Sequence, residues 1–449
     1  MSDLQPLRRV VLCDFYWTRD KDPRVPLGHA SLLATLREAG AADVHTVVRP
    51  VNLAPLVVAE VVRDILVEAE GTDADDVDIA IGVYVWAEAL VQQVLRGLRC
   101  AGFCGRIILG GPQISYAGAG VDGLYLDADV FVRGYGEAAL VALAQLPGRP
   151  VLAGVHYRGL KDRVQQATVD LEALPSPFLS GVVPLAGQRF VRWETQRGCP
   201  FKCSFCQHRE AGSRLKKTCL AEHRVLEEVD LFCAVGVDEI AVLDPIFNAG
   251  GMAIAVLERF AERGFRGRLA LQCRAEMITA EFLAAASRLN VLLEFGLQTI
   301  HEEESLAIRR KNRIVKVEAT LAEVRRLGLA HEVSIIFGLP EQTLASFRES
   351  VQWCLDRRVP VIKAFPLLLL RGTELERDRA KWNLLSDDDA MPLVTSSSTF
   401  TIADWREMQR LSEGLKATEG AHPTRWQELL RSSAEVDLLT ERWRPARAA

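Results

Sequence analysis

Three cysteines, Cys199, Cys203 and Cys206, lie close together near the middle of this 449-residue chain. Their CxxxCxxC spacing, with glycine and proline beside the first and an aromatic residue before the third, suits a short loop around one metal cluster. Thiolates are the usual ligands of iron–sulfur clusters, and a cubane cluster needs four ligands. Because only three arrive together, one iron would stay open to a substrate or cofactor.

Two other interpretations of these cysteines stay open. Free cysteines are often buried as small apolar side chains. A structural zinc site needs a fourth ligand nearby, which His208 would have to supply.

At these residues the sequence resembles the radical S-adenosylmethionine (SAM) superfamily, whose loop reads CxxxCxΦC with Φ aromatic. Cys199, Cys203, Phe205 and Cys206 match that pattern. The resemblance implies a [4Fe-4S] cluster whose open iron holds the amino and carboxylate groups of SAM. It also implies a 5′-deoxyadenosyl radical, formed with electrons from a donor such as flavodoxin or ferredoxin.

Strand-like and helix-like runs alternate ahead of the cysteines, and each strand-like run is short and apolar. This alternation predicts an α/β fold with a doubly wound, Rossmann-like parallel sheet that binds ligands at the carboxyl ends of its strands. We expect its strands and helices over residues 10–13, 29–39, 44–48, 57–68, 79–86, 88–98, 107–109 and 130–132. Cys100 and Cys104 follow the helix 88–98 and are expected to be buried.

The order of these pieces ahead of a cluster loop resembles the cobalamin-binding domain of many radical SAM enzymes. The resemblance implies that cobalamin contacts four loops. These carry Pro26, Leu27, Gly28 and His29, then Tyr84, Val85 and Trp86, then Gly110, Gly111 and Pro112, and finally Gly134, Gly136 and Glu137.

One departure from other cobalamin proteins concerns the cobalt ligand. The Asp-x-His-x-x-Gly pattern that supplies a histidine to cobalt is missing from the first loop. We therefore expect no protein histidine on cobalt; His29 is the nearest candidate, but it falls on a predicted helix.

Helix-like and strand-like runs alternate again after the cysteines. The strand leading into Cys199 and those at 239–243, 269–273, 292–295, 333–337 and 361–368 make six, the number in the superfamily's partial (β/α)6 barrel. Functional groups sit at the carboxyl ends of barrel strands. By resemblance the SAM-binding residues are Phe205, Asp244, Pro245, Phe247, Asn248, Arg274, Glu276, Gln298, Thr299, Gly338 and Leu339.

These runs predict four parts of the chain. Residues 1–150 form the cobalamin-binding domain, 151–188 a linker, 189–375 the radical SAM barrel, and 376–449 a mainly helical lid or substrate region. Leu174-Pro175-Ser176-Pro177 belongs to the linker, because proline restricts its predecessor and lacks an N–H.

Composition narrows the class of protein further. A net charge of -5 without a long basic run argues against nucleic-acid binding. No apolar run reaches the length of a membrane span, and the N-terminus lacks the apolar core of a secretory signal. Ten irregularly spaced cysteines do not resemble a disulfide framework. We expect a cytoplasmic protein.

The commonest reaction of the resembled class is methylation of an unactivated carbon, or of phosphorus, through methylcobalamin and a 5′-deoxyadenosyl radical. Rearrangement, cyclisation and non-radical transfer of a methyl or 3-amino-3-carboxypropyl group are alternatives. A non-catalytic cobalamin or iron–sulfur regulator is an alternative of another class. The sequence predicts neither the small-molecule substrate nor the oligomeric state, because fold does not fix function.

Overall fold

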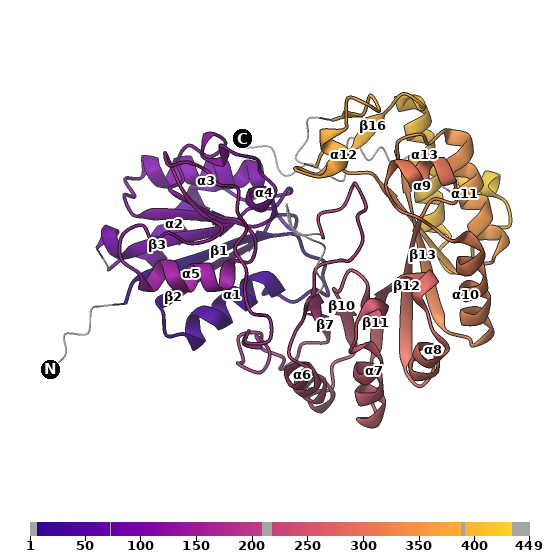
Figure 1. Cartoon of the computed structure of the whole chain (residues 1–449), viewed down its shortest axis with the longest axis horizontal. Helices are drawn as coiled ribbons and strands as arrows, with labels where there is room; N and C mark the ends of the chain where they lie inside the picture. Colours follow the sequence, from indigo (N-terminus) through magenta and orange to yellow (C-terminus); the bar gives the residue numbers. More distant parts are fainter. Residues whose placement is uncertain (1–6, 72, 209–217, 388–390, 433–449) are drawn as a thin grey trace. The chain divides into compact units, whose positions relative to one another are not determined.

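The computed structural model describes residues 7–71, 73–208, 218–387 and 391–432 (Figure 1). The chain divides into two compact units, the first extending to Gln188 and the second beginning at Arg189. Within the described residues, no helix is both long and apolar enough to cross a lipid bilayer. Residues 433–449 of the predicted lid lie outside the described part.

The first unit is a six-stranded sheet with helices on both faces (Figure 1). Its strand order is β2-β1-β3-β4-β5-β6, and only β6 runs antiparallel to its neighbour. The elements are β1 (Arg9–Tyr16), α1 (Leu27–Glu38), β2 (Asp43–Pro50), α2 (Val58–Ala69), β3 (Val77–Gly82), α3 (Glu88–Cys100), β4 (Arg106–Gly110), α4 (Pro112–Ser115), β5 (Val130–Val132), α5 (Gly136–Gln145) and β6 (Val155–Tyr157).

Both faces of β1 are buried, which explains its continuous apolar sequence. Val11 and Phe15 pack in one core with residues of α2 and α3. Val10 and Leu12 face the opposite core, with residues of α1 and α5. The predicted doubly wound sheet is therefore confirmed.

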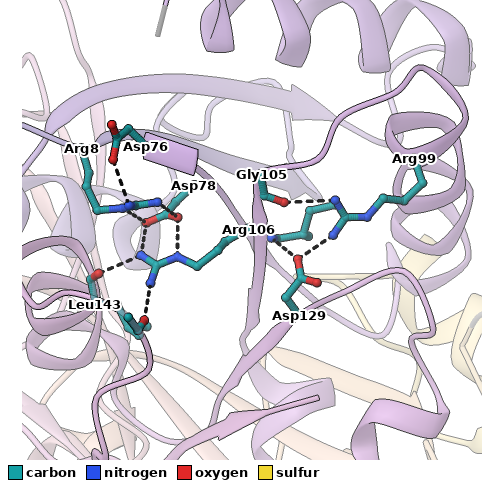
Figure 2. Close-up of polar contacts among 10 residues, drawn as sticks. Arg8, Asp76, Asp78, Arg99, Gly105, Arg106, Asp129 and Leu143 are labelled. Atoms are coloured by element: carbon teal, nitrogen blue, oxygen red, sulfur yellow. Dashed lines mark hydrogen bonds and ion pairs between the residues drawn. The ribbon is translucent and has the colours of Figure 1, made fainter. Parts of the chain in front are cut away.

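The amino ends of β3 and β4 are tied together by a buried carboxylate (Figure 2). Asp78 of β3 accepts hydrogen bonds from Arg106 Nε at 2.7 Å and Arg106 Nη2 at 2.6 Å. Arg8 Nη2 donates to the same carboxylate at 2.9 Å. Nearby, Arg99 pairs with Asp129 at 2.5 Å. This end of the sheet thus carries charged groups that are matched within the chain.

The second unit is built on six parallel strands in the order β14-β13-β12-β11-β10-β7, as predicted. The strands are β7 (Phe190–Trp193), β10 (Glu239–Val242), β11 (Arg268–Cys273), β12 (Asn290–Gln298), β13 (Ala330–Phe337) and β14 (Val361–Pro366). The helices are α6 (Glu222–Val235), α7 (Ala253–Glu262), α8 (Ala280–Ala286), α9 (Glu302–Ala307), α10 (Ile314–Arg326), α11 (Leu344–Asp356), α12 (Glu374–Arg377), α13 (Ile402–Ala417) and α14 (Trp426–Ser432). Short pairs β8 (Gln196–Arg197) with β9 (Thr218–Cys219) and β15 (Leu385–Ser386) with β16 (Val394–Ser396) complete it.

Helix α13 packs on the side of the six-stranded sheet where β14 is the edge strand. It packs against β14 and α11, and its Trp405 is fully buried with its ring centroid 5.6 Å from that of Phe337. Thr401 starts the helix with a capping box to Asp404. Part of the predicted C-terminal region therefore belongs to the barrel core.

Three other expectations differ from the structure. The expected burial of Cys100 and Cys104 is wrong, since both are exposed at and just beyond the end of α3. The predicted linker supplies β6, a strand too short for sequence periodicity to indicate. The strand expected over residues 79–86 ends at Gly82. Tyr84 to Trp86 therefore lie in the turn after it, where the cobalamin resemblance also put them.

Candidate functional site

The three cysteines of the motif lie on one loop that follows β7 and β8. All three thiols are half-buried. The loop is held by backbone contacts to distant segments: Ser204 N donates to the carbonyl of Ile308 at 2.9 Å, and Leu375 N donates to the carbonyl of Ser204 at 2.9 Å. The second unit thus fixes the loop from two sides.

Burial and backbone hydrogen bonds act on the pKa values of two of these thiols in opposite directions. Burial raises the pKa of Cys199 and raises that of Cys206 to about 12, and each sulfur has a backbone N–H directed at it, from Phe201 and His208 respectively. The His208 contact is 3.4 Å long. N–H donors of this kind stabilise the negative charge of a sulfur-ligated cluster. Within the described ranges, no group of three His, Cys, Asp or Glu side chains is arranged to hold a single metal ion.

Arg310 is a site residue that the sequence analysis missed. Its Nη1 lies 3.9 Å from Cys203 Sγ, and its Nη2 donates to the carbonyl of Gly296 in β12. The side chain is buried, and its Nε has no hydrogen-bond partner among the described residues. Arg310 therefore places a buried positive charge beside the cysteine loop.

The end of β12 is distorted where Gln298 was expected to contact SAM. The strand pairing shifts between Gly296 and Gln298, and Gln298 has φ +72°. Asn312 Nδ2 holds the distortion by donating to the carbonyls of Leu297 at 2.7 Å and Thr299 at 2.8 Å. Left-handed backbone in a residue other than glycine is uncommon and concentrates at functional sites.

Arg274 and Glu276, both expected near SAM, lie together beside the cysteine loop. Arg274 Nε donates to Glu276 at 3.3 Å, and its guanidinium lies 4.0 Å from the ring centroid of Phe201. Burial lowers the pKa of Arg274, with the neighbouring charge of Arg310 adding to the effect. Two buried arginines and one carboxylate thus gather near the thiols.

Asp244 and Asn248 are engaged within the chain. Asp244 is buried and accepts hydrogen bonds from Thr195 Oγ1 at 2.5 Å, Thr195 N at 2.7 Å and Gln196 N at 3.2 Å. Asn248 exchanges two hydrogen bonds of 2.9 Å with the backbone of Arg274. Both side chains therefore orient the segments on which the cysteines and Arg274 lie.

The other residues expected near SAM divide into three groups. Phe205 in the cysteine loop and Pro245 after β10 are half-buried, whereas Phe247 is a core residue with its ring centroid 6.3 Å from that of Phe282. Thr299, Gly338 and Leu339 belong to a buried polar network.

That network runs through two residues the sequence analysis did not name. Thr299 Oγ1 donates to Glu304 at 2.5 Å, and Gln342 Nε2 donates to Glu304 at 3.3 Å. Gln342 Oε1 accepts from the backbone N–H groups of Gly338 at 2.7 Å and Leu339 at 3.2 Å. The ends of β12 and β13 are thereby locked together.

In the first unit the predicted cobalamin loops meet at the carboxyl ends of the strands. Pro26, Leu27, Gly28 and His29 open α1. Glu137 at the start of α5 accepts a hydrogen bond of 2.8 Å from Ser31 of α1. The first and the last of the four predicted cobalamin loops along the chain, which lead into α1 and α5, are therefore neighbours.

The turn after β3 presents two stacked rings. The ring centroids of Tyr84 and Trp86 are 4.8 Å apart with planes 6° from parallel, while Val85 between them is half-buried. Trp86 Nε1 donates to the carbonyl of Phe15 at 3.1 Å, which ties this turn to the end of β1.

The glycines of the third and fourth loops are required by close backbone packing. Gly111 has φ +89°, and a Cβ there would lie 2.9 Å from the backbone of Val83; Gly134 has φ +81°, and a Cβ would lie 2.5 Å from the carbonyl oxygen of Ala167. Gly110, Pro112 and Gly136 lie beside them and are half-buried. These glycines shape the loops whether or not a ligand is bound.

Part of the second unit matches a known family model. Residues 193–354 match the family model described as the Radical SAM superfamily. TokK of Streptomyces tokunonensis, a cobalamin-dependent radical SAM methyltransferase, is 27% identical over 310 residues, which are 63% of this chain and 45% of TokK. A 2-(S-pantetheinyl)-carbapenam-3-carboxylate methyltransferase of Streptantibioticus cattleyicolor is 29% identical over 197 residues, 40% of this chain and 29% of that protein. The matched stretch thus covers less than half the length of each relative.

Solved structures share the fold of both units. TsrM from Kitasatospora setae, a radical SAM methyltransferase with cobalamin and a [4Fe-4S] cluster bound, has a TM-score of 0.66 at 17% identity, covering 90% of this chain and 81% of its own. OxsB with aqua-cobalamin and SAM bound has a TM-score of 0.70 at 15% identity, covering 95% of this chain and 70% of its own. At such identities the likeness shows the fold alone.

Proposed function

We propose that this chain, which belongs to the radical SAM superfamily, is a cobalamin-dependent methyltransferase acting on an unactivated carbon, or on phosphorus, of a small molecule. The observation that carries the proposal is the presence of two frameworks in one chain: three half-buried thiols on one loop of a six-stranded parallel unit, and a doubly wound sheet ahead of it. The relatives named as methyltransferases support the reaction class.

In this proposal the second unit holds the cluster and SAM. Cys199, Cys203 and Cys206 are the cluster ligands, with Arg310 compensating their negative charge. The backbone of Phe205 meets the adenine. The residues nearest ribose or carboxylate are Arg274, Glu276 and Gln298.

The remaining predicted SAM residues act by orienting that site. Asp244, Asn248, Thr299, Gly338 and Leu339 already make hydrogen bonds within the chain. Pro245 and Phe247 shape the segment between them. Groups whose own positions are fixed by neighbours hold a bound ligand with less loss of freedom.

The first unit is proposed to bind cobalamin through its four loops, within residues 1–150. The strand order reverses between β1 and β3, and ligands of doubly wound sheets bind beside such a reversal. We propose that residues 189–375 form the barrel and residues 376–449 the C-terminal substrate region, and that residues 151–188, which also supply β6 of the first sheet, lead from the cobalamin-binding domain into the barrel.

The cofactors carry the hard chemistry, while the chain binds and orients them and excludes water. When bound, the cluster supplies an electron that cleaves one SAM to a 5′-deoxyadenosyl radical, and cobalamin carries the methyl group of a second SAM to the substrate. Each turnover then takes two electrons from an external donor, such as flavodoxin or ferredoxin. A reducing cytoplasm suits such a donor and the ten free cysteines.

The test is product analysis with candidate small molecules and SAM that carries a trideuterated methyl group. The proposal predicts a product with three added deuteriums, and S-adenosylhomocysteine and 5′-deoxyadenosine in equal amounts. S-adenosylhomocysteine and methylated product without 5′-deoxyadenosine would indicate polar methyl transfer. With 5′-deoxyadenosine but no methylated product, the reaction would be rearrangement or cyclisation. Methylthioadenosine would indicate aminocarboxypropyl transfer, and no SAM turnover by reduced protein would indicate a regulator.

A further inference from the structure

Two buried aspartates lie toward opposite ends of the first sheet. The carboxylate of one is paired with arginines, and the other has an oxygen without a hydrogen-bond partner among the described residues. Asp78, at the amino end of β3, is paired by Arg8 and Arg106 (Figure 2). Asp14, toward the carboxyl end of β1, is 3% exposed, and its Oδ1 is buried without a hydrogen-bond partner among the described residues. An unpaired buried carboxyl oxygen costs stability and calls for an explanation.

The unpaired oxygen lies at the point where the strand order reverses. Asp14 of β1 pairs in register with Gly82, the last residue of β3. A Cβ added to Gly82 would lie 3.2 Å from Tyr84 Cε2 and 3.9 Å from Asp14 Oδ2. Asp14 and the ring of Tyr84 thus flank the same glycine, between the two strands where a doubly wound sheet binds its ligand.

A second unpaired atom lies on the next element. Tyr84 Oη would be 3.5 Å from a Cβ on Gly28, which precedes His29 in α1. His29 is 2% exposed, and its Nδ1 is buried with no partner in the part of the chain that the structure describes. Burial lowers the pKa of His29 to about 4, so the ring is neutral near pH 7.

We propose that Asp14 is a cofactor-binding residue, whose free carboxyl oxygen receives a primary carboxamide of cobalamin, with His29 at the start of α1 as a second polar contact. This inference rests on the proposed function and adds a residue that none of the sequence patterns marks. The corrin ring carries primary carboxamides around its edge, and each offers both N–H donors and a carbonyl acceptor.

The chemistry of Asp14 matches such a group. Burial raises the pKa of the Asp14 carboxyl to about 7. A carboxyl that is partly protonated near neutral pH both donates and accepts, as a carboxamide does. A neutral histidine offers one donor and one acceptor nitrogen. In the absence of ligand these atoms destabilise the fold, and binding would satisfy them.

The experiment measures two quantities on the full chain with its cluster reconstituted: the dissociation constant for hydroxocobalamin and the melting temperature without cobalamin. We expect Asp14→Leu to weaken hydroxocobalamin binding about tenfold or more, as loss of a hydrogen bond to a strongly polar group does. The same variant should melt at a higher temperature without cobalamin, since it removes an unsatisfied polar group. Asp14→Asn should stay within about threefold of the parent's affinity, because an amide keeps a donor and an acceptor.

Asp78→Leu is the matched control, because it removes an equally buried but paired aspartate from the same sheet. It should lower the melting temperature while the folded fraction binds hydroxocobalamin as the parent does. Unchanged affinity for hydroxocobalamin in Asp14→Leu would overturn the inference. If the melting temperature of that variant also fell, Asp14 would have a structural role only. If the parent itself takes up no hydroxocobalamin, the proposed function fails first and the inference falls with it.

Discussion

Arg310 Nη1 lies 3.9 Å from Cys203 Sγ, although 107 residues separate them in the chain. The same guanidinium donates to the Gly296 carbonyl, so the distorted end of β12 and the cysteine loop meet at one side chain. The charge is therefore positioned to act on whatever the thiols hold.

Replacing Arg310 with Met should make the reduction potential of the cluster more negative by on the order of 50 mV. A positive charge favours the more negative reduced state. A unit charge about 4 Å away contributes about 4 kcal/mol at an effective dielectric constant of about 20, and spreading of the added electron over the cluster lowers this to roughly 1 kcal/mol. Potentiometric titration followed by electron paramagnetic resonance measures the shift. Arg309→Met removes the same charge one residue away, where the side chain is exposed and paired with Glu374 at 2.6 Å. Equal shifts in both variants would contradict a specific role for Arg310.

The cluster assignment itself is tested by removing its three proposed ligands. Anaerobically reconstituted protein should hold one four-iron cluster, and the Cys199→Ala, Cys203→Ala, Cys206→Ala variant should lose its absorbance and reduced paramagnetic signal. Cys100→Ala, Cys104→Ala is the control, because that exposed pair has the same spacing as the first two motif cysteines. Four irons retained in the triple variant would refute the assignment.

Asp244 should make the stability of the second unit depend on pH. Burial raises its pKa to about 6, against the opposing hydrogen bonds from Thr195 and Gln196. A folded pKa above the unfolded one means that the contribution is complete below pH about 4 and is lost as the pH rises through about 6. The change is about 3 kcal/mol for two pKa units. Asp244→Asn should therefore flatten the melting temperature between pH 4 and 7.

Asp230 serves as a control, because its pKa is shifted in the opposite direction from that of Asp244. Arg263 and Arg259 lower its pKa to about 2, so its contribution is present above pH about 4 and is lost only as the pH falls through about 2. Asp230→Asn should shift the melting temperature by the same amount at every pH from 5 to 8. If Asp244→Asn also shifted the melting temperature equally at every pH, the conclusion that burial raises the pKa of Asp244 would be wrong.

Cobalt(II) in the bound cofactor should show no nitrogen superhyperfine splitting in its paramagnetic spectrum. The first loop lacks the histidine pattern, and His29 is buried within the first turn of α1. His29→Ala should leave the spectrum without splitting as well. Splitting in the parent that His29→Ala abolished would make His29 the cobalt ligand.

The sequence predicted the elements better than the contacts between them. Apolar runs such as Val10 to Leu12 predict buried strands, and both six-stranded sheets contain the strands expected. Polar residues that act across distant segments carry no local signal: Arg310 looks like any basic residue after a helix, and Asp14 like a strand-end aspartate. A helical C-terminal region was predicted, but the core position of Trp405 in α13 was not, because it arises only through packing on Phe337.

The central claim is that one chain moves a methyl group from SAM to cobalamin and also cleaves SAM reductively. The most direct test incubates the reduced protein, with cluster and cobalamin bound, with SAM bearing a trideuterated methyl group. We predict that the extracted cobalamin carries the deuterated methyl group, with S-adenosylhomocysteine in equal amount. We also predict that 5′-deoxyadenosine forms in the parent and not in the Cys199→Ala, Cys203→Ala, Cys206→Ala variant. If 5′-deoxyadenosine formed while the cobalamin stayed unlabelled and no S-adenosylhomocysteine appeared, the claim would be contradicted.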